Sequence, residues 1–148
     1  MIRKVRHLVA RFFEMGRPVE SIDDDDRYAA ERLAPAELEL WRRMDARDRR
    51  HSVAVTRRFL VACPDATRAE TAAALLHDVG KVATDLGRFG RAIATVAPLT
   101  RTMIIYRDHE RLGGRMLAEL GADRRTIELV DGTCDDEIAR ALRGADDA

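Results

Sequence analysis

The apolar residues of the chain recur mainly at helical spacing, and few segments alternate with period two. An N-terminal stripe predicts a first helix, formed by Val5, Leu8, Val9, Phe12 and Phe13. Residues 23–26 are all aspartate, which is typical of a solvated loop and helix start. Pro35 suits the first position of a second helix. That helix directs three apolar side chains inward, namely Leu38, Trp41 and Met44.

The centre of the chain predicts two helices in close succession. The first runs from about Asp48 to Ala62, stops before Pro64, and carries an inward stripe of His51, Val55 and Phe59. Thr67 caps the second helix, which ends at His77-Asp78. Gly80 then suits a left-handed helix end.

The remaining sequence predicts further helices with short connections. One spans residues 84–96, one or two lie in residues 99–121, and another follows a cap at Asp123. After a turn at 131–133, a last helix has an apolar side formed by Ile138, Ala141, Leu142 and Ala145. We expect an all-α, compact single-domain bundle, with N-terminal helices in residues 1–47 packing on a core of residues 48–148.

Composition narrows the possible partners. The 26 basic and 26 acidic side chains cancel, so net charge gives no reason to expect binding to a nucleic-acid polymer or a membrane. No segment has the roughly 18–20 apolar residues of a membrane span. Cys63 and Cys134 fit neither a metal-binding spacing nor a disulfide framework, which favours a reducing, cytoplasmic setting. The sequence gives no indication of an oligomeric state.

The pair His77-Asp78 ends the most apolar helix of the chain. An ionised aspartate in apolar surroundings is costly unless its charge is compensated. Histidine and aspartate are both ligands for divalent metal ions, and adjacent side chains at a helix end can converge. A His-Asp pair alone is a weak signal, because one arises often by chance.

Two further residues are candidate ligands. The helices around Pro64 are expected to pack antiparallel, which brings His51 to the same end of the bundle as His77. Asp146 lies four residues after Leu142, at the edge of the apolar face, whereas Asp147 faces water more. Considered alone, His51 would more often be a satisfied core residue and Asp146 part of a polar tail. The antiparallel packing is what favours a ligand role for His51, and the need for a second anionic ligand is what brings in Asp146.

The order His51, His77-Asp78, Asp146 resembles the H…HD…D pattern of the HD-domain superfamily. "ALLHDVGK" is similar to that family's central motif, and "LRGADD" resembles its closing helix. The likeness covers residues 48–147, and the segment 77–121 resembles small bacterial HD-domain proteins.

This resemblance implies a metal-dependent phosphohydrolase acting on a small phosphate ester, expected to be a nucleotide. One divalent ion (Mn, Fe, Co, Ni, Zn or Mg) would be held by His51, His77, Asp78 and Asp146. Asp78 would also orient the attacking water. Lys81 would contact the phosphate, or else be a solvated cation at a helix end.

The sequence also departs from the family pattern. His109 stands where relatives hold a second metal, but no histidine follows it. We therefore expect one metal ion. His109 would be a pocket residue or a helix-start residue. Asp131 would be a turn residue, with a role as an oxygen ligand as the less favoured alternative. The candidates for phosphate binding are Arg88, Arg91 and Arg111, each of which could instead lie on a solvated face.

Two other functional classes stay open. The incomplete second-metal pattern is compatible with a catalytically weak or inactive regulatory module that binds a ligand. Iron-dependent oxygenation would need more histidine and carboxylate ligands than the sequence supplies.

Overall fold

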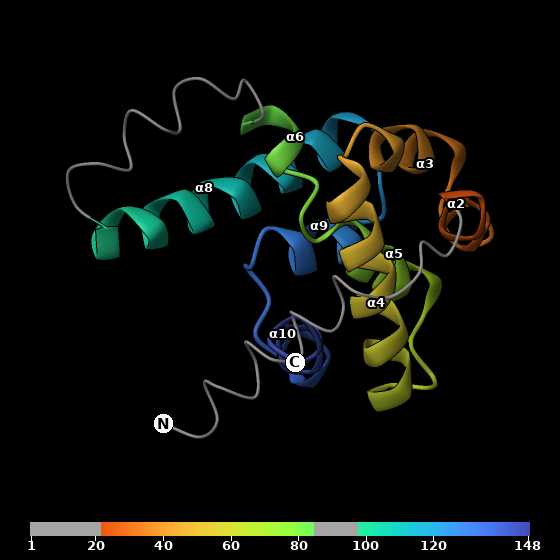
Figure 1. Cartoon of the computed structure of the whole chain (residues 1–148). Helices are drawn as coiled ribbons and strands as arrows, with labels where there is room; N and C mark the ends of the chain where they lie inside the picture. The colour runs from red at the N-terminus through yellow and green to blue at the C-terminus, as the bar shows by residue number, and fades with distance from the viewer. Residues whose placement is uncertain (1–21, 85–97) are drawn as a thin grey trace.

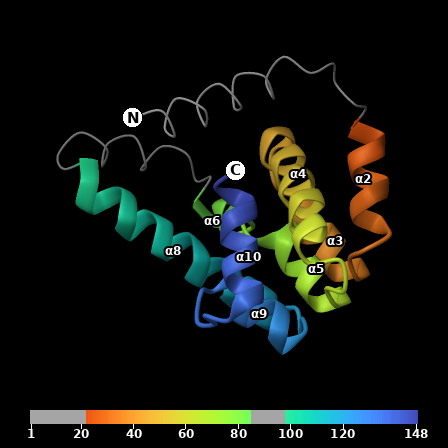
Figure 2. The same ribbon diagram turned by 90° about the horizontal axis from the view of Figure 1, so that it is seen from below.

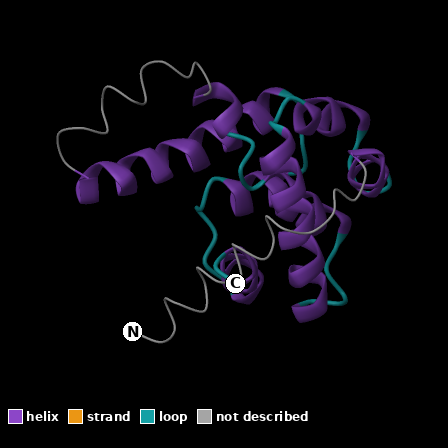
Figure 3. Cartoon of the chain, in the orientation of Figure 1, coloured by secondary structure: helices purple, strands orange, loops and turns teal. Residues whose placement is uncertain are grey.

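The computed structural model describes residues 22–84 and 98–148, and every regular element in these ranges is a helix (Figure 3). In chain order the elements are α2 (Ile22–Ala30), α3 (Pro35–Arg42), α4 (Ala46–Ala62), α5 (Arg68–Leu76), α6 (Lys81–Thr84), α8 (Pro98–Glu119), α9 (Arg124–Val130) and α10 (Glu137–Asp146). The expected all-α class is confirmed for this part of the chain. The helix predicted at residues 5–13 and most of the one predicted at 84–96 lie outside the described residues.

The helices α4 and α5 form the centre of the bundle (Figure 1). The helix α4 packs against α5, α10 and α2, and α5 also packs against α9 and α3. The helix α8 packs against α9 and α6, and its N-terminal turns extend away from the other labelled helices in both ribbon views (Figure 2). Functional groups on α4, α5 and α10 can therefore meet around one end of α5.

The core is formed by the apolar faces of α3, α4 and α5 together with parts of α8, α9 and α10. The expected inward residues Val55 and Phe59 are fully buried. Trp41 is also buried, and its indole Nε1 donates a hydrogen bond to Ser52 Oγ at 2.9 Å. This bond satisfies the one polar atom of a large buried ring and ties α3 to α4.

The predicted helix starts are found with their predicted caps. Thr67 and Glu70 form a reciprocal capping box, in which each side chain accepts a hydrogen bond from the other's backbone N–H. Asp123 accepts from Arg125 N at 2.8 Å, and Pro35 is the first residue of α3. The aspartate run lies at a helix start, as expected, but it belongs to the first turns of α2 rather than to a loop, and its Asp25 is buried rather than solvated.

The expectation for Gly80 was wrong. Among the described glycines, positive φ angles occur only at Gly121 and Gly132. Gly80 is needed for space instead, because a Cβ atom there would lie 1.9 Å from the carbonyl oxygen of His109. The chain after α5 thus approaches the backbone of α8 so closely that only glycine fits.

The expectation that no segment spans a membrane can be compared only with the described helices. None of these is both long enough and apolar enough to cross a lipid bilayer.

Candidate metal centre

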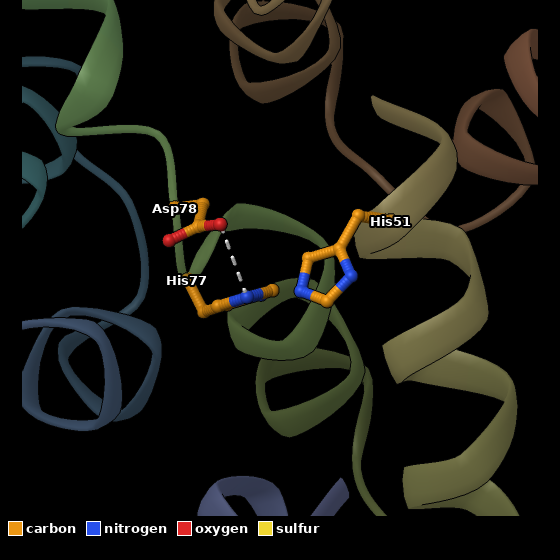
Figure 4. Close-up of side chains that lie close together, drawn as sticks. All are labelled: His51, His77 and Asp78. Atoms are coloured by element: carbon orange, nitrogen blue, oxygen red, sulfur yellow. Dashed lines mark ion pairs between the residues drawn. The ribbon is translucent and has the colours of Figure 1, made fainter. Parts of the chain in front are cut away.

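Four candidate ligands, drawn from three helices, meet at the C-terminal end of α5. His51 projects from α4 toward His77, which is the C-cap residue of α5, and Asp78 follows directly (Figure 4). One ligand atom from each of these three residues lies within 4.8 Å of the other two. Asp146, the last residue of α10, places Oδ1 2.8 Å from Nε2 of His51 and 3.4 Å from Nε2 of His77. The structure therefore brings together all four residues predicted as metal ligands.

The imidazole of His77 is oriented by the backbone of its own helix. Its Nδ1 lies 2.8 Å from the carbonyl oxygen of Ala74, and a carbonyl can only accept, so Nδ1 carries the proton. In the neutral ring the lone pair is then on Nε2. A backbone carbonyl that fixes the tautomer in this way is a common arrangement behind metal-binding histidines.

Nε2 of His77 is buried and has no hydrogen-bond partner among the described residues. Carboxylate oxygens of Asp146 and Asp78 lie 3.4 and 3.6 Å from it. A lone pair that faces two anionic oxygens is repelled by them, so the arrangement requires a cation. Burial opposes a charged imidazole, but the two carboxylates outweigh it and raise the pKa of His77. A proton or a metal ion at Nε2 therefore resolves the same repulsion.

Asp146 is held in place through the C-terminal end of α10. Arg58 of α4 donates from Nε to the carbonyl oxygen of Ala145 at 2.7 Å, which anchors the last turn of α10 on α4. Burial alone would raise the pKa of Asp146, but the hydrogen bond with His51 and the nearby His77 lower it far below its usual range. The side chain is therefore ionised at neutral pH and could act as an oxygen ligand.

Lys81 lies between two carboxylates. Its Nζ donates to Asp78 Oδ2 at 2.6 Å and lies 3.6 Å from Asp48 Oδ1. Burial opposes the charge on Lys81, but the two carboxylates outweigh the effect of burial and raise the pKa of Lys81. Burial also raises the pKa of Asp48. Sequence reasoning treated Asp48 only as the start of a helix. Its position three residues before His51, on the same face of α4, was the available signal.

A pocket of about 180 Å³ opens beside these residues. Its titratable lining residues are His77, Asp78, Lys81, His109, Glu110, Arg143 and Asp146. Its other lining residues are Leu129, Val130, Gly132, Ala139 and Leu142. The expected pocket positions of Lys81 and His109 are thus found. Arg143 and Glu110 were missed, although Arg143 stands three residues before Asp146 and so shares its face of α10.

The arginines that were expected to bind phosphate are not found among the lining residues, so far as the structure describes them. Arg111 is exposed and does not line the pocket, because it lies two residues after His109 and so about 200° around α8. Arg88 and Arg91 lie outside the described residues. Asp131 serves a turn, since its Oδ1 accepts from both the backbone N–H and the hydroxyl of Thr133.

Comparisons with known proteins give no match: no protein-family profile, no curated protein and no solved structure is significantly similar to the chain. The centre is therefore characterised by its donors alone. Two imidazoles and two carboxylates form a set that suits borderline to hard divalent ions such as Mn²⁺, Fe²⁺, Co²⁺, Ni²⁺ and Zn²⁺.

Proposed function

We propose that the protein is a metal-dependent phosphohydrolase of the HD-domain type that cleaves a small phosphate ester. One observation carries the proposal. The buried Nε2 of His77 points its lone pair between two carboxylates, with His51 beside them, and has no hydrogen-bond partner among the described residues. The sequence resemblance to HD-domain proteins supports the same assignment, because its four motif residues are the ones that meet at this end of α5.

The four side chains fit a divalent ion. His77 offers a nitrogen whose tautomer is fixed by Ala74, and Asp146 offers an ionised oxygen 2.8 Å from His51. A bound ion of this kind lowers the pKa of a coordinated water toward neutrality and offsets charge that develops on phosphorus. We expect one such ion, with Mn²⁺, Fe²⁺, Co²⁺, Ni²⁺, Zn²⁺ and Mg²⁺ as the candidates.

The chain's own residues supply the remaining functions. Asp78 accepts a hydrogen bond from the attacking water and orients it. Lys81 and Arg143, which both line the pocket, compensate the negative charge of the phosphate. The water oxygen forms a new bond to phosphorus while the bond from phosphorus to the alcohol oxygen breaks. The water loses one proton and the departing alcohol takes one up from solvent, so inorganic phosphate and a free alcohol are the products.

The proposal is tested with a pair of adjacent aspartates. Asp146→Asn removes an ionised ligand, whereas Asp147→Asn changes an exposed neighbour and serves as the control. Calorimetric titration of the metal-stripped protein with each of the six candidate ions should give about one bound equivalent. Asp146→Asn should weaken binding by at least about 10–100-fold, the loss typical of a disturbed metal shell. Phosphate release from p-nitrophenyl phosphate should fall in parallel, while Asp147→Asn should match the wild type.

Failure to bind any of these ions, together with no phosphate release, would contradict the proposal. Tight metal binding that Asp146→Asn abolishes, with no turnover of any phosphate ester, would instead support the alternative of a regulatory module that binds a ligand.

A further inference from the structure

The size of the pocket limits what can occupy it. The pocket has a volume of about 180 Å³, and a large molecule would have to extend out of it. This volume is also below the ~300–1,000 Å³ of typical small-molecule pockets. A triose or hexose phosphate is compact, whereas a nucleoside monophosphate adds a nucleobase to the sugar and the phosphate.

The chemistry of the walls points the same way. Beside the metal centre the lining is aliphatic, with Leu129 and Val130 from α9 and Ala139 and Leu142 from α10. Apart from its two histidines, the described lining includes no aromatic side chain on which a nucleobase could stack. These walls fit a short aliphatic or saturated carbon skeleton.

The charge of the lining restricts the substrate further. Lys81 already pairs with Asp78 and Asp48, and Arg143 pairs with Asp135, while Glu110 and Asp146 add two further carboxylates to the lining. One phosphomonoester carries about −1.5 to −2 at neutral pH. A bound divalent ion would therefore supply the main positive charge for one phosphate group, and a second anionic group would meet only cations that are already paired.

From these three features, and resting on the proposed phosphohydrolase function, we propose that the substrate is a compact phosphomonoester with an uncharged, non-aromatic alcohol part. Triose- and hexose-sized monophosphates belong to this class. Nucleotides and bisphosphates do not.

The test is a substrate panel with the metal-loaded full chain. Phosphate release is measured for glycerol 2-phosphate, glycerol 3-phosphate, glucose 6-phosphate, fructose 1,6-bisphosphate, AMP and UMP. We expect kcat/KM for the best compact monophosphate to exceed that for either nucleotide and for the bisphosphate by at least tenfold. A nucleotide or the bisphosphate as the best substrate would overturn the inference while leaving the phosphohydrolase proposal standing. No release from any ester would overturn the proposed function itself.

Two wall variants test the size argument directly. Leu142→Ala widens the pocket and should raise the ratio of kcat/KM for AMP to that for glycerol 3-phosphate by about tenfold. Ala139→Leu narrows it and should lower kcat/KM for glucose 6-phosphate at least fivefold more than for glycerol 3-phosphate. Because Leu142 is buried and its truncation could unfold the chain, Val130→Ala provides a milder widening with the same expected direction. Unchanged ratios in folded variants would show that these walls do not select the substrate.

Discussion

The two ends of helix α5 both carry charged groups, but they differ in how those groups are satisfied. At the N-terminal end, Arg125 donates from Nε and Nη2 to Glu70 Oε1, at 3.1 Å each, and its Nη1 lies 2.8 Å from Asp136 Oδ2. The other oxygen of Glu70 accepts from the backbone N–H of Thr67. Each charge at this end thus has an opposite charge or a hydrogen-bond donor within the protein.

At the C-terminal end, Asp78 pairs with Lys81 and Asp146 with His51, but one imidazole nitrogen is left without a hydrogen bond in the described part of the chain. Asp146 and Asp78 surround Nε2 of His77, which has no hydrogen-bond partner among the described residues. Buried polar groups are normally paired, so an exception calls for a role beyond folding. The N-terminal cluster thus has its charges paired within the protein, whereas the C-terminal cluster is the site at which we propose that a metal ion binds.

The C-terminal end of α5 also depends on the close approach of two backbone segments at Gly80. A substitution that prevents this approach should produce the largest loss of stability. In Gly80→Ala the new Cβ would lie 1.9 Å from His109 O and 2.9 Å from Gly113 N, and neither backbone atom can rotate away. We expect the free energy of unfolding to fall by about 3 kcal/mol, as for severe overpacking. Metal affinity should fall at least tenfold, because the adjacent Asp78 and Lys81 move with this turn. Urea unfolding and metal titration measure the two effects.

Gly144→Ala is the matched control for this substitution. Gly144 lies inside α10, and a Cβ there meets nothing within 4 Å. Alanine should therefore stabilise the chain by about 0.5–1 kcal/mol through the lower entropy of its unfolded state. If both alanine variants changed stability in the same direction, the proposed role of the close approach at Gly80 would be wrong.

Much of the arrangement around α5 could be predicted from the sequence, because it depends on local patterns. The stripe of His51, Val55 and Phe59 on α4 gave the buried face, and Thr67 marked the start of α5. The short connection at Pro64 predicted that His51 would lie beside His77, and their ring centroids are 5.7 Å apart. Helical period and a short connection thus sufficed to bring His51 beside His77, whereas a ligand role for Asp146 also depended on the family resemblance.

The remainder depends on contacts between distant segments, which no local pattern specifies. Gly80 was predicted to adopt a left-handed conformation, but its real constraint is His109, far along the chain on α8. The pairing of Asp48 with Lys81 and the position of Arg143 in the pocket follow from how α4, the turn after α5 and α10 pack together. The network of Glu70, Arg125 and Asp136 was missed for the same reason.

The N-terminal cluster should affect stability without affecting metal binding. Arg125→Ala leaves Glu70, which is largely buried, without its cationic partner. Removing one member of such a pair costs about 3–5 kcal/mol when it is fully buried, and the partial exposure of Arg125 reduces our expectation to about 2 kcal/mol. Metal affinity, measured by calorimetry on the same preparation, should stay within twofold of the wild type.

The neighbouring arginine provides the control. Arg124 pairs with Glu128 at 2.7 Å but is 91% exposed, so Arg124→Ala should change stability by less than about 0.5 kcal/mol. A loss of metal affinity in Arg125→Ala equal to that in Asp146→Asn would remove the distinction between the two ends of α5.

The smallest effect is a pH dependence of the N-terminal cluster. The hydrogen bond from Arg125 lowers the pKa of Asp136. Burial would raise the pKa of Glu70, but its hydrogen bonds with Thr67 and Arg125 outweigh burial and lower this pKa as well. A carboxyl group whose folded pKa is depressed contributes stability above its unfolded pKa of about 4, and this contribution is lost as the pH falls through the folded value. The destabilisation caused by Arg125→Ala should therefore be full at pH 6–7 and shrink below about pH 4, where the two carboxyl groups become protonated in the unfolded chain before they do so in the folded wild type. Urea unfolding of wild type and variant at pH 7, 5, 4 and 3 measures this difference. A difference in unfolding free energy that stays constant to pH 3 would mean that the cluster stabilises α5 by packing rather than by charge.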